Sequence, residues 1–132
     1  MTETMTRLEE FPQWVMAICD AIDTLDFASA FDKFTPDAEL IFGTEILRGA
    51  EEMKKFFFKI DSPLSSKHEI FEVWSGSGRI YVRGQADLIK KAPPNQQFIG
   101  PFQWMFYEDP DDNNLLRMWR VTAGPVKTDA VV

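Results

Sequence analysis

The sequence predicts an α+β domain in which three helices come first and an antiparallel sheet follows. Up to about residue 60, apolar residues recur at the three- and four-residue spacing of helices. From His68 onward they alternate with polar residues, and turn-forming segments separate the alternating stretches. The 132 residues suit one domain, which we place at 12–126, between a polar lead-in (1–11) and a tail (127–132).

The helices are expected in the first half of the chain. The first runs from Pro12 to about Leu25, because proline suits a first turn and apolar residues follow at helical spacing. Asp26 would cap a second, short helix, whose aromatic and small residues repeat at i, i+3, i+4 and i+7. A short strand at 38–42 then precedes a third helix over about 50–60.

Long strands fill the second half. A Ser-Gly-Ser-Gly turn predicts a hairpin between the first two of them, and a proline-marked loop and an acidic turn separate the rest. The expected strands are 68–74, 79–89, 98–108 and 115–123. A strongly twisted sheet of this kind can curl around its helices and enclose a cavity.

Composition excludes several function classes. A net charge of −7 argues against binding to a phosphate backbone, so nucleic acid is not an expected partner. One cysteine and one histidine give neither a disulfide nor a clustered metal-ligand pattern, and we expect no metal or cofactor. No apolar run has the length of a signal peptide or a membrane span, so we expect a cytoplasmic protein without membrane association. Twelve Phe and four Trp favour a pocket for an apolar ligand.

His68, the single histidine, opens the first long strand. Strict alternation would place Ile70, Glu72 and Trp74 on the same face as His68. Glu72 is then either a second acid near the histidine or part of an exposed outer face. Asp23 borders the buried stripe of the first helix, so it is either solvated at the helix end or directed inward.

The order of elements and four short segments resemble the NTF2-like superfamily, in its SnoaL-like branch. The segments are Asp-Thr-Leu-Asp-Phe at 23–27, Phe-Thr-Pro-Asp-Ala at 34–38, Leu-Arg-Gly-Ala at 47–50 and Lys-His-Glu-Ile at 67–70. The resemblance covers residues 12–126. It implies a cone with a deep pocket between the curled sheet and the helices, and a homodimer formed through the outer face of the sheet. Known members include polyketide cyclases, ketosteroid isomerase, limonene epoxide hydrolase, scytalone dehydratase and non-catalytic binding proteins.

Two of these activities are disfavoured by the residues present. The position of the general base of ketosteroid isomerase is occupied here by Phe42. The Asp-Arg-Asp set of limonene epoxide hydrolase matches Gly84, Ala86 and Val121. Neither mechanism is expected from this chain.

Scytalone dehydratase is similar in one respect, because it has a histidine and an aspartate at the positions of His68 and Asp23, although this chain lacks its second histidine. The resemblance therefore implies an acid–base pair. A carboxylate bonded to one imidazole nitrogen fixes the tautomer, and the other nitrogen can remove or return a proton near neutral pH. The alternative is a histidine bonded to backbone or water and a solvated aspartate.

Six further residues are candidates for substrate contact. Arg117 or Tyr107 would hold an oxyanion or a hydroxyl group, if the face of the last strand that carries Arg117 is the inner one; otherwise Arg117 forms a salt bridge. The remaining candidates are hydrogen-bonding or aromatic residues, which could equally be structural: Phe42, Gln103, Trp104 and Trp119. Cys19 lies in an apolar row and is expected to be inert packing.

These observations favour a cofactor-free isomerase, cyclase or dehydratase that acts on a small hydrophobic metabolite, such as a polyketide or terpenoid biosynthetic intermediate. One alternative is a non-catalytic ligand-binding or dimeric accessory protein. Another is a structural protein whose cavity is filled by aromatic side chains. The discriminating feature is whether Asp23 and His68 meet inside a water-poor cavity.

Overall fold

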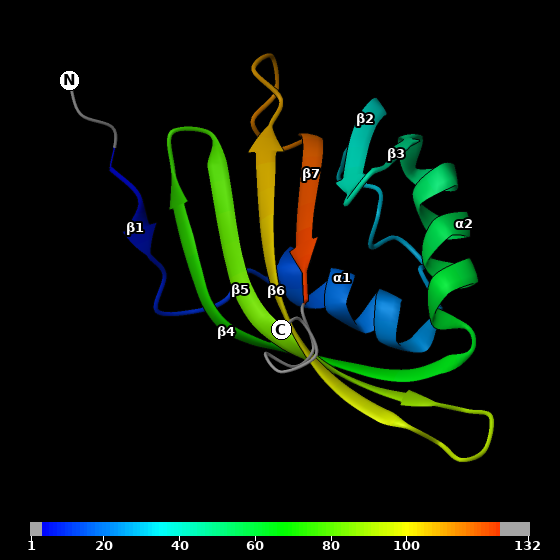
Figure 1. The fold of residues 1–132 in the computed structure, drawn as a ribbon. Helices are drawn as coiled ribbons and strands as arrows, with labels where there is room; N and C mark the ends of the chain where they lie inside the picture. Colours follow the sequence, from blue (N-terminus) through cyan, green and yellow to red (C-terminus); the bar gives the residue numbers. More distant parts are fainter. Residues whose placement is uncertain (1–3, 125–132) are drawn as a thin grey trace.

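The computed structural model describes residues 4–124, in which a curved seven-stranded sheet wraps around two helices (Figure 1). The helices are α1 (Gln13–Thr24) and α2 (Gly49–Asp61). The strands are β1 (Thr6–Arg7), β2 (Phe34–Phe42), β3 (Glu45–Arg48), β4 (Leu64–Gly76), β5 (Arg79–Lys90), β6 (Gln97–Glu108) and β7 (Leu116–Ala123). Within the described residues, neither helix is long and apolar enough to cross a membrane.

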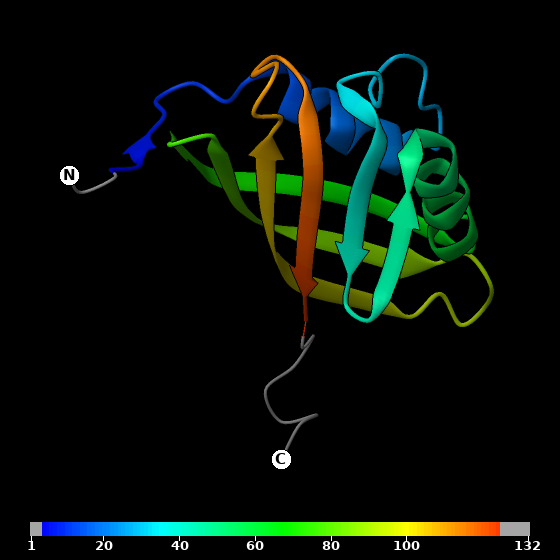
Figure 2. The ribbon, with the colours of Figure 1, turned by 90° about the horizontal axis from the view of Figure 1, so that it is seen from above.

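The strand order is β1-β4-β5-β6-β7-β2-β3, and all neighbours are antiparallel except β2 and β7, which run parallel. The long strands β4, β5 and β6 bend along their length, and both helices lie within the curve (Figures 1 and 2). The predicted α+β class and the curled sheet are therefore confirmed. The predicted tail at 127–132 lies outside the described residues.

One of the three predicted helices is wrong. The segment expected to form the second helix makes successive turns instead, with i to i+3 hydrogen bonds such as Ala30 N–H to the Phe27 carbonyl. Ala28 has a positive φ of 44°, which interrupts a right-handed helix. Pro36 disfavours helical backbone at the residue before it, and strand β2 already begins at Phe34. The spacing of the aromatic residues reflects their burial, not a helix.

The aromatic core lies beneath the helices. Trp119 is fully buried and stacks on Phe34, Phe57 and Phe106, with ring centroids 5.2–5.8 Å apart. Phe31, from the turn segment, meets Trp119 edge-on at 6.0 Å. Burying each large side chain contributes about 1.5–3 kcal/mol, so this cluster anchors β2, α2, β6 and β7 to one another.

Strand β4 contains a bulge that changes which residues face inward. Ile70 pairs with Gly84 and Glu72 pairs with Arg83, so Phe71 is an extra residue without a partner. Ile70 and Val73 are consequently both buried, and Glu72 lies on the outer face. The prediction that Glu72 shares a face with His68 is wrong for this reason.

Two short strands were not predicted. Strand β3 pairs with β2 in a hairpin around Gly43, whose φ is +61°. Strand β1 adds two residues to the free edge of β4. Both strands are too short to show a periodic pattern in the sequence. Strand β3 leads directly into α2 and so helps to position that helix.

Candidate functional site

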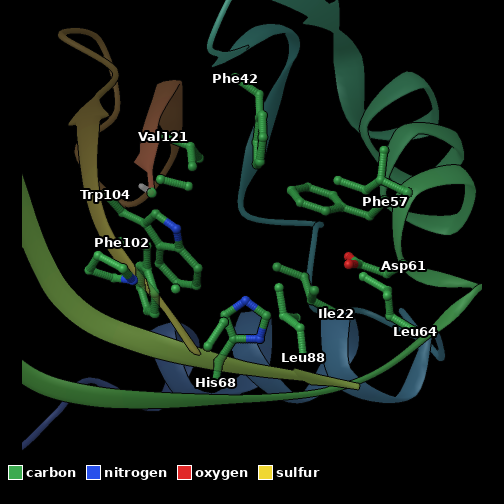
Figure 3. A pocket seen from close by; sticks show the side chains of 16 residues that line it. Ile22, Phe42, Phe57, Asp61, Leu64, His68, Leu88, Phe102, Trp104 and Val121 are labelled. Carbon is green, nitrogen blue, oxygen red and sulfur yellow. The ribbon is translucent and has the colours of Figure 1, made fainter. Parts of the chain in front are cut away.

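A cavity of about 340 Å³ lies between the concave face of the sheet and the two helices (Figure 3). Most of the residues that line it are apolar: Ile22, Phe42, Phe57, Ile60, Leu64, Ala86, Leu88, Phe102, Trp104 and Val121. The ionisable residues among those lining it are His68 and Asp61. Its size lies at the small end of the range for ligand sites, and its composition suits a small apolar molecule with one or two polar groups.

The structure brings His68 and Asp23 together. Nδ1 of His68 lies 2.5 Å from Oδ1 of Asp23, and the backbone N–H of His68 donates to Oδ2 of the same carboxylate at 2.9 Å. The hydroxyl of Ser66 also donates to Oδ1, at 3.2 Å. The side chains of His68 and Asp23 are only 12% and 17% exposed. The contact is therefore largely shielded from bulk water.

Local structure explains this contact. Helix α1 ends at Thr24, and Leu25 turns the chain away with a φ of 59°. Asp23 thus lies in the last turn, beside the buried residues Cys19 and Ile22. The inner face of β4 passes below this turn, with His68 pointing into the cavity (Figure 3).

The histidine ring has one nitrogen available for chemistry. Because Nδ1 is bonded to Asp23, Nε2 is the nitrogen left without a hydrogen-bond partner among residues 4–124. The ring packs against Phe102 and Trp104, with centroids 5.4 and 6.0 Å away. These contacts hold its orientation, so a ligand in the cavity would meet a fixed imidazole.

Asp61 also faces the cavity, although it directly follows the helix predicted over 50–60 and was not among the predicted site residues. It is the last residue of α2, it is 8% exposed, and its carboxyl group points into the cavity (Figure 3). Burial raises its pKa from the ordinary 3.8 to about 6; the charge of His68 opposes this rise and that of Asp23 adds to it. The buried face of α2 repeats every four residues, at Met53, Phe57 and Asp61, and this spacing could have revealed it.

Of the six residues predicted to contact substrate, Phe42 and Trp104 line the cavity. Trp119 lies deeper, in the aromatic core, and is not among the lining residues. Its buried indole Nε1 has no hydrogen-bond partner among residues 4–124.

The other three, Gln103, Tyr107 and Arg117, lie outside the cavity. Phe102, Trp104 and Phe106 occupy the inner face of β6, so alternation directs Gln103 and Tyr107 outward. A bulge in the pairing of β6 with β7 leaves Arg117 on the outer surface, with its guanidinium 5.5 Å from the ring centroid of Tyr107. The expected oxyanion contact from Arg117 or Tyr107 is therefore not available inside the cavity.

Two other residues considered from the sequence, Glu72 and Cys19, have surroundings that suit a structural role. Glu72 forms an ion pair with Arg83 at 2.9 Å on the outer face, and this hydrogen bond lowers its pKa. Cys19 is buried, and burial raises the pKa of its thiol to about 12, which opposes thiolate chemistry. Within residues 4–124, no three His, Cys, Asp or Glu side chains are grouped so as to hold a metal ion.

Comparison with solved structures gives the class of fold. A hypothetical protein from Catenulispora acidiphila with a ketosteroid isomerase-like fold, solved with trimethylamine, has 12% identity and a TM-score of 0.73, and the match covers 86% of both chains. An NTF2-like protein from Anabaena variabilis has 13% identity and a TM-score of 0.72, covering 86% of this chain and 85% of the other. A protein assigned as a SnoaL-like polyketide cyclase from a Jannaschia species has 14% identity and a TM-score of 0.69, covering 88% and 90%.

The chain therefore has the NTF2-like fold, as the sequence predicted, and its structural neighbours include SnoaL-like proteins. No protein-family model matches the sequence, and no curated protein matches it significantly.

Proposed function

We propose that the protein is a cofactor-free acid–base enzyme, an isomerase, cyclase or dehydratase, that moves a proton on a small hydrophobic metabolite. The observation that carries this proposal is the hydrogen bond between Asp23 and His68 at the wall of an apolar cavity. An imidazole held by a carboxylate in such a place is suited to general acid–base catalysis.

The geometry supports the following roles. The Nδ1–H of His68 donates a hydrogen bond to Asp23, which leaves the lone pair of Nε2 free to take a proton from a carbon next to a carbonyl group. The protonated imidazole is stabilised by the Asp23 carboxylate and can return the proton to another position of the substrate. Electrostatic interactions are stronger in the cavity than in bulk water, because apolar side chains exclude solvent.

The cavity supports a small, flat and largely apolar substrate. Phe42, Phe102 and Trp104 present aromatic surfaces, and aliphatic side chains fill the remaining wall. A polyketide or terpenoid biosynthetic intermediate has this character, and the SnoaL-like structural neighbour favours a polyketide.

Hydrogen–deuterium exchange on a surrogate ketone tests the proposal. 2-Tetralone is small and apolar and carries exchangeable protons next to its carbonyl, so NMR in D2O can follow their loss. We expect the wild-type protein to accelerate exchange above the buffer rate and His68→Gln to abolish the acceleration. Lys67→Gln, an exposed change at the neighbouring position of β4, is the matched control. Saturable binding of the ketone without exchange would instead support a non-catalytic binding protein.

We also propose that the protein forms a homodimer through the outer face of the sheet, as the resemblance implies. The support is the fold itself, together with half-buried large side chains on that face such as Phe71, Tyr81 and Met105. Native mass spectrometry would count the subunits and would detect a retained small molecule in the same spectrum. A monomer at micromolar concentration would contradict the dimer.

A further inference from the structure

We propose that Asp61 is a second catalytic residue, which delivers a proton to the substrate while His68 removes one, and that the substrate is uncharged. This inference rests on the proposed function of the His68–Asp23 pair. It assigns the donor of the second proton, and it narrows the class of substrate.

The placement of Asp61 is the first argument. Its carboxyl group enters the cavity from the end of α2, whereas His68 enters from β4, so the two groups lie on different walls of one space (Figure 3). A substrate between them can lose a proton on one side and gain one on the other.

The isolation of Asp61 is the second argument. No donor hydrogen-bonds to its carboxyl group within residues 4–124, although the residue is more than nine-tenths buried. A charged carboxylate in such surroundings is costly, and a neutral carboxylic acid is favoured. The ionisable groups that act on the pKa of Asp61 are His68 from β4 and Asp23 from α1, and the raised pKa is consistent with a neutral acid in mildly acidic solution. A neutral carboxylic acid has an O–H group that can donate to a ligand.

The proton balance of enolisation fits these two groups without a cofactor. Nε2 of His68 takes the proton from the carbon next to a carbonyl, and the electrons of that C–H bond form a C=C bond. The carbonyl π electrons move to oxygen, which takes the proton of Asp61. In the reverse direction the enol returns its proton to Asp61, and His68 protonates the same carbon or, where a second C=C bond is conjugated with the enol, the carbon at the far end of that bond. Both groups are then restored.

The charge of the cavity wall is the third argument. The lining residues include no Lys or Arg, whereas Asp61 lines the cavity and Asp23 lies directly behind His68. An anionic substrate would be desolvated without a cation to compensate it. It would be repelled by the Asp23 carboxylate and, above about pH 6, also by ionised Asp61. A neutral ketone needs only the hydrogen bond that Asp61 can donate.

Titration of Asp61 tests the inference without depending on catalysis. We would label aspartate side chains with ¹³C, record carboxyl shifts against pH, and assign the Asp61 signal by its absence in Asp61→Asn. We expect a midpoint near pH 6. A midpoint at the ordinary value near 3.8 would overturn the assignment of Asp61 as a proton donor.

A matched pair of ligands tests the charge of the substrate. 2-Acetylnaphthalene and 2-naphthoate have similar shapes, but only the second is an anion at pH 8. We expect the ketone to bind wild-type protein at least about tenfold more tightly, a difference of about 1.4 kcal/mol. Asp61→Asn should narrow this preference. Equal binding of the two ligands to the wild type would overturn the inference of an uncharged substrate.

Exchange on 2-tetralone separates this inference from the proposed function. The wild-type exchange rate should fall as pH rises through about 6, because Asp61 then loses its proton. We expect Asp61→Asn to exchange about 10²-fold more slowly, typical of a lost general acid, and to lack this fall. Asp32→Asn removes an exposed charge and should change neither the exchange rate nor its pH dependence. Activity lost in His68→Gln but kept in Asp61→Asn would overturn only the role of Asp61. Exchange unaffected by either substitution would overturn both proposals.

Discussion

Asp23 binds His68 at two points, because one carboxylate accepts hydrogen bonds from both the ring Nδ1 and the backbone N–H of the same residue. The end of α1 therefore fixes the path of β4 and the orientation of the imidazole together. A change at Asp23 should consequently affect both stability and chemistry.

The first prediction concerns Asp23→Asn. The asparagine amide can present N–H groups to Nδ1, which favours the tautomer that carries its proton on Nε2 and removes the base. We expect 2-tetralone exchange to fall by about 10²–10⁴-fold and the free energy of unfolding in urea to fall by about 1–3 kcal/mol. Asp20→Asn, an exposed change on the same helix, should leave both quantities near the wild type. An active, equally stable Asp23→Asn would contradict the role of the pair.

The second prediction concerns Asp61 and the pH dependence of stability. The pKa of Asp61 is raised on folding, so the native state holds this proton more tightly than the unfolded state. The favourable contribution of Asp61 protonation to the free energy of unfolding is complete below pH 3.8 and is lost as pH rises to about 6. Asp61→Asn should therefore be more stable than the wild type by about 2–3 kcal/mol at pH 7, and the two should converge near pH 4.

Urea unfolding at several pH values measures this difference, with Asp32→Asn as the exposed control. A difference that does not vary between pH 4 and pH 7 would show that Asp61 ionises normally.

The third prediction concerns Gly84, which faces the bulge in β4. A Cβ at this position would collide with the backbone oxygen of Glu69 and lie 2.8 Å from a ring carbon of Phe102. Gly84→Ala should lower the free energy of unfolding by at least about 2 kcal/mol, since strand β4 or Phe102 would have to move. At Gly100 a Cβ has no neighbour within 4 Å, and Gly100→Ala should be close to neutral. Similar unfolding midpoints in urea for the two variants would mean that β4 and Phe102 do not approach Gly84 as closely as the structure indicates.

Much of this fold follows from patterns that the sequence shows directly. The period of apolar residues predicted α1, α2 and the four long strands to within a few residues. The inward direction of Asp23 was left open, because a residue at the border of a buried stripe can turn either way until its partner strand is placed. Only the packing of α1 against β4 decides whether Asp23 points inward or toward solvent.

Bulges account for most of what the sequence could not predict. Inserting one residue into a strand exchanges its inner and outer faces, and no local signal at Phe71 or Arg117 announces the insertion. Strict alternation thus assigned Glu72 to the face of His68. The aromatic residues at 27, 31 and 34 gave a second error, because buried turns and a helix can share the same spacing.

The last prediction concerns the size of the cavity. Ala86 lines it and pairs with His68 across β4 and β5, and the residue is 7% exposed. Ala86→Leu should place its added carbons in the open space, so the unfolding midpoint should change little while 2-acetylnaphthalene binds at least about tenfold more weakly. Ala92→Leu, the same change in an exposed loop, should bind normally. If Ala86→Leu folds normally and binds the ketone as the wild type does, the ligand does not occupy this cavity, and the site must be sought elsewhere on the protein.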